Sequence, residues 1–135
     1  MHATGCMLPH VKLSEKPIPG FSNVTDVPVP ESARIEQDKT MIMGSNDHWT
    51  GHFVYSTKQP STYVIDFINT QMQNLGWKKI SVLRGSETNF TFTRKDRVAN
   101  VKISTSNEFL SKKTIVSIDM ATTSLKSNDV DKCDN

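Results

Sequence analysis

The chain has 135 residues, a formal net charge of +2 and 36% hydrophobic residues. This length fits one small domain with extensions and leaves no room for two domains. The hydrophobic fraction lies below the roughly 45% of a typical globular domain, and no run reaches the about 18 consecutive apolar residues of a transmembrane helix. We therefore expect one domain, some chain outside its core, and no transmembrane helix.

Cys6 closes the run Ala3-Thr4-Gly5-Cys6, which has the small-residue form of a bacterial lipobox. In a lipobox, the signal peptidase leaves the cysteine at the new N-terminus, where its thiol is acylated. A secretory signal needs a basic segment and an apolar segment of about 7–15 residues before the cut. Only five residues precede Cys6, so the lipid-anchor hypothesis implies a longer precursor. A chance pattern, a free thiol and a disulfide with Cys133 remain alternatives.

Composition divides the chain into four parts. Residues 1–30 carry the lipobox-like run and then a proline-rich stretch, which favours extended backbone and predicts a tether. Residues 31–48 form a connecting segment, residues 49–123 the globular domain, and residues 124–135 a disordered acidic tail.

The clearest local signal is an amphipathic helix over residues 61–75. Pro60 and the pair Ser61-Thr62 suit a helix start with a capping hydroxyl. Gly76 follows the last apolar position and predicts a left-handed stop, after which Trp77 folds back on the helix in a Schellman turn. The apolar face comprises Val64, Phe67, Ile68, Met72 and Leu75.

Segments on both sides of this helix alternate with a period of two, as strands with one buried face do. Gly85-Ser86 indicates a turn and Lys95-Asp96 a hairpin tip. The predicted strands span residues 49–56, 78–83, 89–94, 98–104 and 114–121. The expected fold is therefore α+β: one amphipathic helix packed on a mostly antiparallel sheet in β-α-β-β-β order, after the Pro-rich tether.

Short packing motifs are spread over residues 27–121: Val27-Pro28-Val29-Pro30-Glu31, Trp49-Thr50-Gly51, Val54-Tyr55, Phe67, Met72, Gly76-Trp77 and Phe92-Thr93-Arg94-Lys95. Their order resembles the helix-grip domains of outer-membrane assembly lipoproteins such as BamC. The amino-acid sequences of the motifs more closely resemble a group of uncharacterised proteobacterial lipoproteins. The resemblance implies an envelope location, a lipid anchor on Cys6, and a binding or scaffolding role. The likeness to BamC is one of architecture, so its partners do not carry over.

Residue types that carry chemistry show no catalytic pattern. His48 and His52 are four apart beside Asp47, but they fall at a strand start, where this spacing does not place two ligands on one face. No Gly-x-Ser-x-Gly elbow, glycine-rich phosphate loop or paired carboxylates occur. We therefore expect no catalytic residues, no metal site, no cofactor and no enzyme.

Charge is the one uneven property of the chain. Residues 77–113 hold nine basic and three acidic side chains, an excess of six positive charges. Such a surface suits an acidic protein, anionic lipid heads or phosphate; a solvated sheet guarded by lysines against edge pairing is the alternative. The candidate basic patch comprises Lys78, Lys79, Arg84, Arg94, Lys95, Arg97 and Lys102.

These features together predict a non-catalytic binding or scaffold module of the bacterial envelope. We expect it at the outer membrane, facing the periplasm, anchored by a lipid on Cys6 and bound to another envelope protein. Two alternatives stay open. One is a soluble helix-grip domain that binds a small apolar ligand between helix and sheet. The other is a basic sheet that binds single-stranded nucleic acid beside Phe90 and Phe92, although we expect no nucleic-acid partner.

Overall fold

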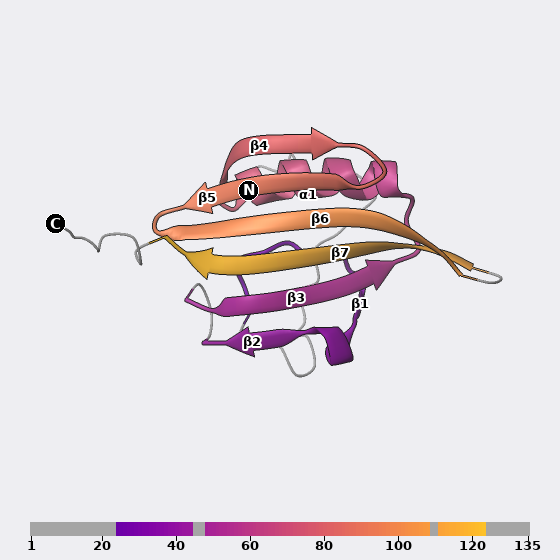
Figure 1. The fold of residues 1–135 in the computed structure, drawn as a ribbon, viewed down its shortest axis with the longest axis horizontal. Helices are drawn as coiled ribbons and strands as arrows, with labels where there is room; N and C mark the ends of the chain where they lie inside the picture. Colours follow the sequence, from indigo (N-terminus) through magenta and orange to yellow (C-terminus); the bar gives the residue numbers. More distant parts are fainter. Residues whose placement is uncertain (1–23, 45–47, 109–110, 124–135) are drawn as a thin grey trace, which may run out of the picture.

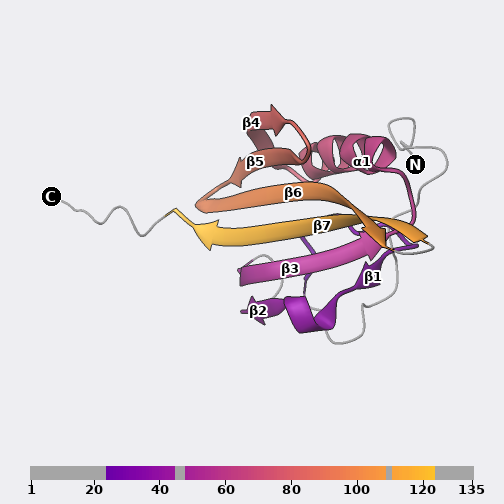
Figure 2. The same ribbon diagram turned by 45° about the vertical axis from the view of Figure 1, so that its right-hand side comes forward.

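Seven strands form one antiparallel sheet, and helix α1 packs on one of its faces (Figures 1 and 2). The computed structural model describes residues 24–44, 48–108 and 111–123. The strand order is β1-β3-β7-β6-β5-β4, and β2 also pairs with β3. The elements are β1 (Arg34–Ile35), the 3-10 helix η2 (Gln37–Lys39), β2 (Met41–Met43), β3 (Thr50–Thr57), α1 (Ser61–Asn74), β4 (Lys78–Arg84), β5 (Thr88–Arg94), β6 (Arg97–Glu108) and β7 (Ser111–Thr122).

The α+β class, the helix and all five predicted strands are confirmed. Strands β1 and β2 are additions, because residues 31–48 were expected to be only a connection. Both lie along the same edge of β3, one after the other. Between β1 and β2, two residues bind the backbone of Val54. The Val54 N–H donates to the Thr40 hydroxyl (3.0 Å), and the Val54 carbonyl accepts from the Glu36 N–H (2.9 Å).

Glycine is required at position 51, where β3 pairs with β2. Gly51 has a φ of +131°, and a Cβ at this position would lie 2.1 Å from the Met41 carbonyl oxygen. No side chain fits there, so Gly51 sets how closely β2 can pair.

The predicted end of α1 is confirmed. Gly76 has a φ of +94°. Its N–H donates to the Gln73 carbonyl (3.0 Å) and the Trp77 N–H to that of Met72 (3.0 Å), which is the Schellman pattern. The start differs from the prediction, because Pro60 is the N-cap residue and no side chain caps the helix. The Pro60 carbonyl accepts from the Tyr63 and Val64 N–H groups (3.0 and 3.1 Å), which begins the helical hydrogen-bond pattern.

The core fills the space between α1 and the sheet with large side chains. Helix α1 lies over the β4–β6 half of the sheet (Figure 2). The largest fully buried side chains include Trp49, Tyr55, Phe53, Phe67, Phe90, Phe92, Ile68 and Met72. The helix–sheet interface is therefore packed with aromatic and aliphatic side chains.

Residues 24–30, which we call the strap, belong to this core. They were predicted to be part of the tether, but Val24, Val27 and Val29 are buried in the core cluster. The domain therefore begins at residue 24 or earlier and not at residue 49. The tether was predicted from the proline content alone. The prolines do keep the strap extended, but its valines still bury their side chains.

A buried ion pair holds the strap in place. Asp26 and Arg97 are each 5% exposed, and the Arg97 guanidinium donates from Nη1 to the Asp26 carboxylate. The indole of Trp49 donates to the same carboxylate (2.7 Å), and that of Trp77 donates to the Asp26 backbone carbonyl (2.8 Å). Arg97 also donates to the Trp49 carbonyl (2.9 Å) and lies against both indole rings, at 5.8 and 5.5 Å from their centroids.

Removing one member of this pair should strongly destabilise the domain. Arg97→Met leaves the Asp26 carboxylate buried without its cation, at an expected loss of about 3–5 kcal/mol in the free energy of unfolding. Urea unfolding followed by tryptophan fluorescence measures the loss. Lys102→Met is the matched control, because Lys102 lies exposed on the same strand and should change stability by less than about 0.5 kcal/mol. Equal losses in the two variants would contradict a structural role for the pair.

Tyr55 should make the domain less stable in alkali. Its hydroxyl is buried and donates to the Pro28 carbonyl of the strap (3.1 Å), and burial raises the pKa of Tyr55 well above its usual value. Above about pH 10 the unfolded chain loses this proton and the folded protein keeps it, so stability falls as the pH rises. Urea unfolding between about pH 8 and 11 should show a steeper fall for the wild type than for Tyr55→Phe. The same slope in both proteins would contradict this assignment.

Candidate functional site

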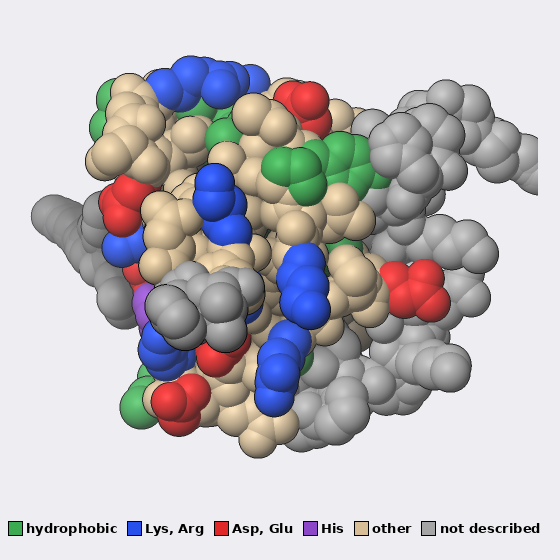
Figure 3. Space-filling model, turned by 90° about the vertical axis from the view of Figure 1, so that its right-hand side faces the viewer, with side chains coloured by type: hydrophobic (Ala, Val, Ile, Leu, Met, Phe, Trp, Pro, Cys, Tyr) green, Lys and Arg blue, Asp and Glu red, His purple; other side chains and the backbone are tan. Residues whose placement is uncertain are grey.

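A polar pocket with three cationic side chains opens where β1, the end of β3 and the start of β7 meet. Its volume is about 440 Å³. Figure 3 views this end of the molecule and shows Lys and Arg side chains in a row down its surface. We call it the basic pocket; it is lined by Ser32, Arg34, Ser56, Thr57, Lys58, Gln59 and Lys113.

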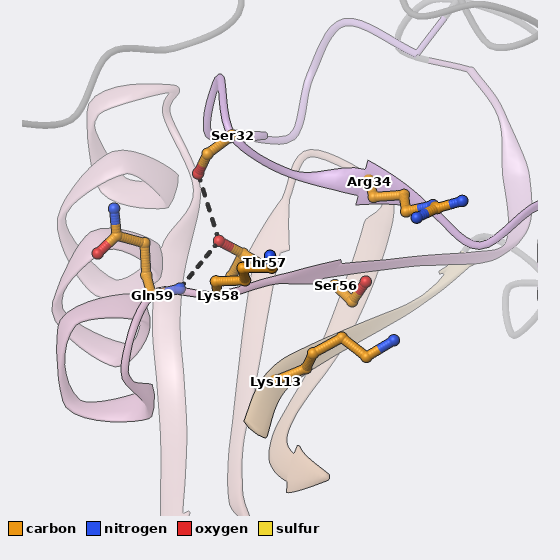
Figure 4. Close-up of a pocket in the computed structure, with 7 residues that line it drawn as sticks. All are labelled: Ser32, Arg34, Ser56, Thr57, Lys58, Gln59 and Lys113. Carbon is orange, nitrogen blue, oxygen red and sulfur yellow. Dashed lines mark hydrogen bonds between the residues drawn. The ribbon is translucent and has the colours of Figure 1, made fainter. Parts of the chain in front are cut away.

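Strand register brings the cations to one face of the sheet. Arg34 pairs with Ser56, and Ser56 pairs with Ile115, two residues after Lys113. Because alternate residues of a strand point to the same face, Arg34, Ser56 and Lys113 share a face. In Figure 4 the Arg34 and Lys113 side chains extend in the same direction on either side of Ser56.

Hydroxyl groups fix the inner wall of the basic pocket. The Thr57 hydroxyl accepts from the Gln59 N–H (3.2 Å) and shares a hydrogen bond with the Ser32 hydroxyl (3.3 Å; Figure 4). The Thr114 hydroxyl donates to the Gln59 carbonyl (2.7 Å), which ties the turn before α1 to β7. The backbone at residues 57–59 is thus held from two sides.

The electrostatics of the basic pocket favour an anion. The described residues that line it include three cations and neither a carboxylate nor a histidine. Glu36 stands beside it and accepts from the Ser56 hydroxyl (2.8 Å). The guanidinium and the two ammonium groups of the lining suit phosphate or carboxylate oxygens.

The structure does not bring the predicted basic patch together. Arg97 lies in the core and is removed from the patch, because its charge pairs with Asp26. Arg94 lies over the Trp77 ring at 6.0 Å. Lys79 donates to Asn69 of α1 (2.9 Å) and stands over the Phe90 ring, on the helix side of the sheet.

The other four predicted patch residues are exposed but spread apart. Lys78 and Arg84 lie at opposite ends of β4, and Lys95 is at the β5–β6 turn. Lys102 pairs with Ser117 and Asn89, whose side chains lie on the face away from α1. The excess charge of this region is therefore distributed over several surfaces.

The histidines and the phenylalanines singled out in the sequence also receive a place in the fold. His52 pairs with Asp119 across the β3–β7 ladder, and His48 is exposed just before Trp49. Within the described ranges, no group of three His, Cys, Asp or Glu residues could hold a metal ion. Phe90 and Phe92 are buried under α1, so these rings provide no stacking platform for nucleic-acid bases.

Comparison with known proteins identifies the fold family. Residues 37–114 match the START domain-like family, which is more than half of the chain. The chain belongs to the START domain-like family. This family match agrees with the predicted helix-grip architecture, in which the sheet wraps around one helix. No curated protein and no solved structure matches the chain.

Sequence reasoning missed the basic pocket. Arg34 fell in the supposed connecting segment, Lys58 in a turn, and Lys113 outside the chosen patch. The alternation of polar and apolar residues at Arg34, Ile35 and Glu36 is a weak strand signal. It could have placed Arg34 on a strand. Cys6 lies outside the described residues, so the lipid anchor stays a prediction. Among the described residues, no helix is long and apolar enough to cross a membrane.

Proposed function

We propose that this protein is a non-catalytic binding module that recognises an anionic group at the basic pocket. The observation that carries the proposal is that Arg34, Lys58 and Lys113 all line one open pocket. A guanidinium presents paired donors to phosphate or carboxylate oxygens, and the ammonium groups add charge without fixing direction. The hydroxyl and amide groups of the lining can complete the hydrogen bonds.

Membership of the START domain-like family supports a ligand-binding role and also favours a small apolar ligand as a second candidate. Such a ligand would lie between helix and sheet, where Trp49, Phe67 and Phe92 are fully buried. Opening room there would cost several kcal/mol of lost packing. This packing supports binding at the surface over binding in the interior.

The cellular setting of this module is the second part of the proposal. We place the protein at the outer membrane, facing the periplasm, where a lipid on Cys6 would anchor it and another envelope protein would be its partner. The lipobox-like run supports this placement, as does the distance in sequence between Cys6 and the strap, with 17 residues between them. Fully extended, these residues would span at most about 60 Å.

Anion binding should depend on the basic pocket. Pyrophosphate, used as a probe in an NMR titration, should shift the amide resonances of residues 56–59. In Arg34→Ala/Lys113→Ala its Kd should rise at least about tenfold, because two charge-assisted hydrogen bonds are lost. Glu36→Gln should lower the Kd, because it removes the neighbouring negative charge.

Lys102→Ala is the matched control for this titration, since it removes one exposed cation outside the basic pocket. It should leave the Kd within about twofold of the wild type, apart from weak screening effects. Shifts that scatter over all lysines, or equal Kd values in all variants, would overturn the proposed site.

The lipid anchor makes a separate prediction. Expressed in a bacterium behind a lipoprotein signal sequence, the wild-type chain should fractionate with membranes and incorporate radioactive palmitate. Cys6→Ala should be soluble and unlabelled, whereas Cys133→Ala should behave as the wild type. Absence of label on the wild-type chain would reject the anchor and leave the basic pocket proposal standing.

A further inference from the structure

Strand β4 ends the sheet and offers an open edge. It pairs with β5 on one side, and no described strand pairs with it on the other. In Figure 1 β4 lies at the margin of the sheet, beyond β5. The backbone N–H and C=O groups on its outer side have no strand to pair with among the described residues, which makes the edge a template for a further strand.

Large apolar side chains are exposed at this edge. Ile80 is 54% exposed and Leu83 is 69% exposed, whereas the other large hydrophobic residues that are exposed in the described part of the chain, Met41 and Met43, lie on β2. The register shift between Lys79 and Ser81 takes Ile80 out of the regular alternation. Apolar side chains in such positions are anchors for a docked segment, because its own apolar side chains can cover them.

Charge selects among the possible occupants. Strand β4 contributes Lys78, Lys79 and Arg84 and no acidic residue. Lys79 is engaged by Asn69 of α1, and the other two cations stand exposed at the two ends of the strand. A second copy of β4 would bring like charges together, whereas an acidic strand would place opposite charges side by side.

Lysines on an edge strand also serve to prevent pairing. That role alone does not account for Ile80 and Leu83, because a guarded edge gains nothing from leaving two large aliphatic side chains in water. The cationic ends and apolar middle of β4 match an extended segment with acidic residues at its two ends and apolar residues between them.

We infer that β4 docks an extended segment of an acidic partner protein, added to the sheet as a further strand. The backbone of β4 supplies the hydrogen bonds, Ile80 and Leu83 supply the apolar contact, and Lys78 and Arg84 select acidic side chains. This surface lies across the sheet from β1, and the inference stands independently of the basic pocket.

A synthetic peptide tests the inference. The probe is a peptide of about ten residues, the length of a long strand, with Glu at both ends and Val between them, and its counterpart carries Lys in place of Glu. Calorimetric titration should show binding of the acidic peptide alone, weakened by salt. Amide hydrogen exchange of residues 78–84 should slow in the complex, which is the signature of strand addition.

Matched variants separate β4 from the opposite edge. Ile80→Ser/Leu83→Ser should raise the Kd of the acidic peptide at least tenfold, while Met41→Ser/Met43→Ser removes equivalent exposed side chains from β2 and should leave it unchanged. Lys78→Glu/Arg84→Glu should transfer binding to the Lys-Val peptide. Protection on β2, equal effects of both serine pairs, binding of both peptides, or self-association through β4 without peptide would each overturn the inference.

Discussion

The pairing of Asp26 with Arg97 between two tryptophans is the constraint on which the rest of the structure depends. Neither charge could remain in this core alone, since burying an unpaired ion costs several kcal/mol. Each indole donates its N–H to Asp26, so the same residue satisfies the two aromatic groups that most need a polar partner in the interior. Through its carboxylate and its backbone carbonyl, Asp26 therefore fixes the strap, the start of β3, the end of α1 and the start of β6 relative to one another.

The strap in turn positions one wall of the basic pocket. From Asp26 the chain runs through Pro28, whose carbonyl accepts from Tyr55, to Pro30, whose carbonyl accepts from the Ala33 N–H. Arg34 follows directly, in a strand of only two residues. A strand this short has little stability of its own, so the place of Arg34 depends on the strap before it and on the Thr40 contacts after it. The core ion pair and the surface cation are linked through the short stretch of chain from Asp26 to Arg34.

Local patterns predicted the elements with long, regular signals, and they failed where distant residues decide. Helix α1 ends at Gly76 as predicted, because the glycine and the following tryptophan are enough to specify a Schellman turn. The strap was misjudged, because its burial depends on the indoles of Trp49 and Trp77, which are 23 and 51 residues away from Asp26. Arg97 was placed on the surface for the same reason: nothing near it in sequence indicates a buried partner. The basic pocket combines three distant segments through strand register, which composition and periodicity cannot supply.

The packed interior also explains why both proposed binding surfaces lie at the margins of this domain. Fully buried aromatic side chains occupy the space under α1, so groups that can meet a partner lie outside it, and those of the two proposed surfaces lie at strand ends and at an open edge. The two such surfaces have different supports. The basic pocket rests on β1, β3 and the strap, whereas β4 is held by β5 and α1 at the other side of the sheet. Because the Trp77 indole next to β4 also donates to Asp26 of the strap, a change that loosens the strap should disturb both surfaces, the cations around Ser56 through Arg34 and β4 through Trp77.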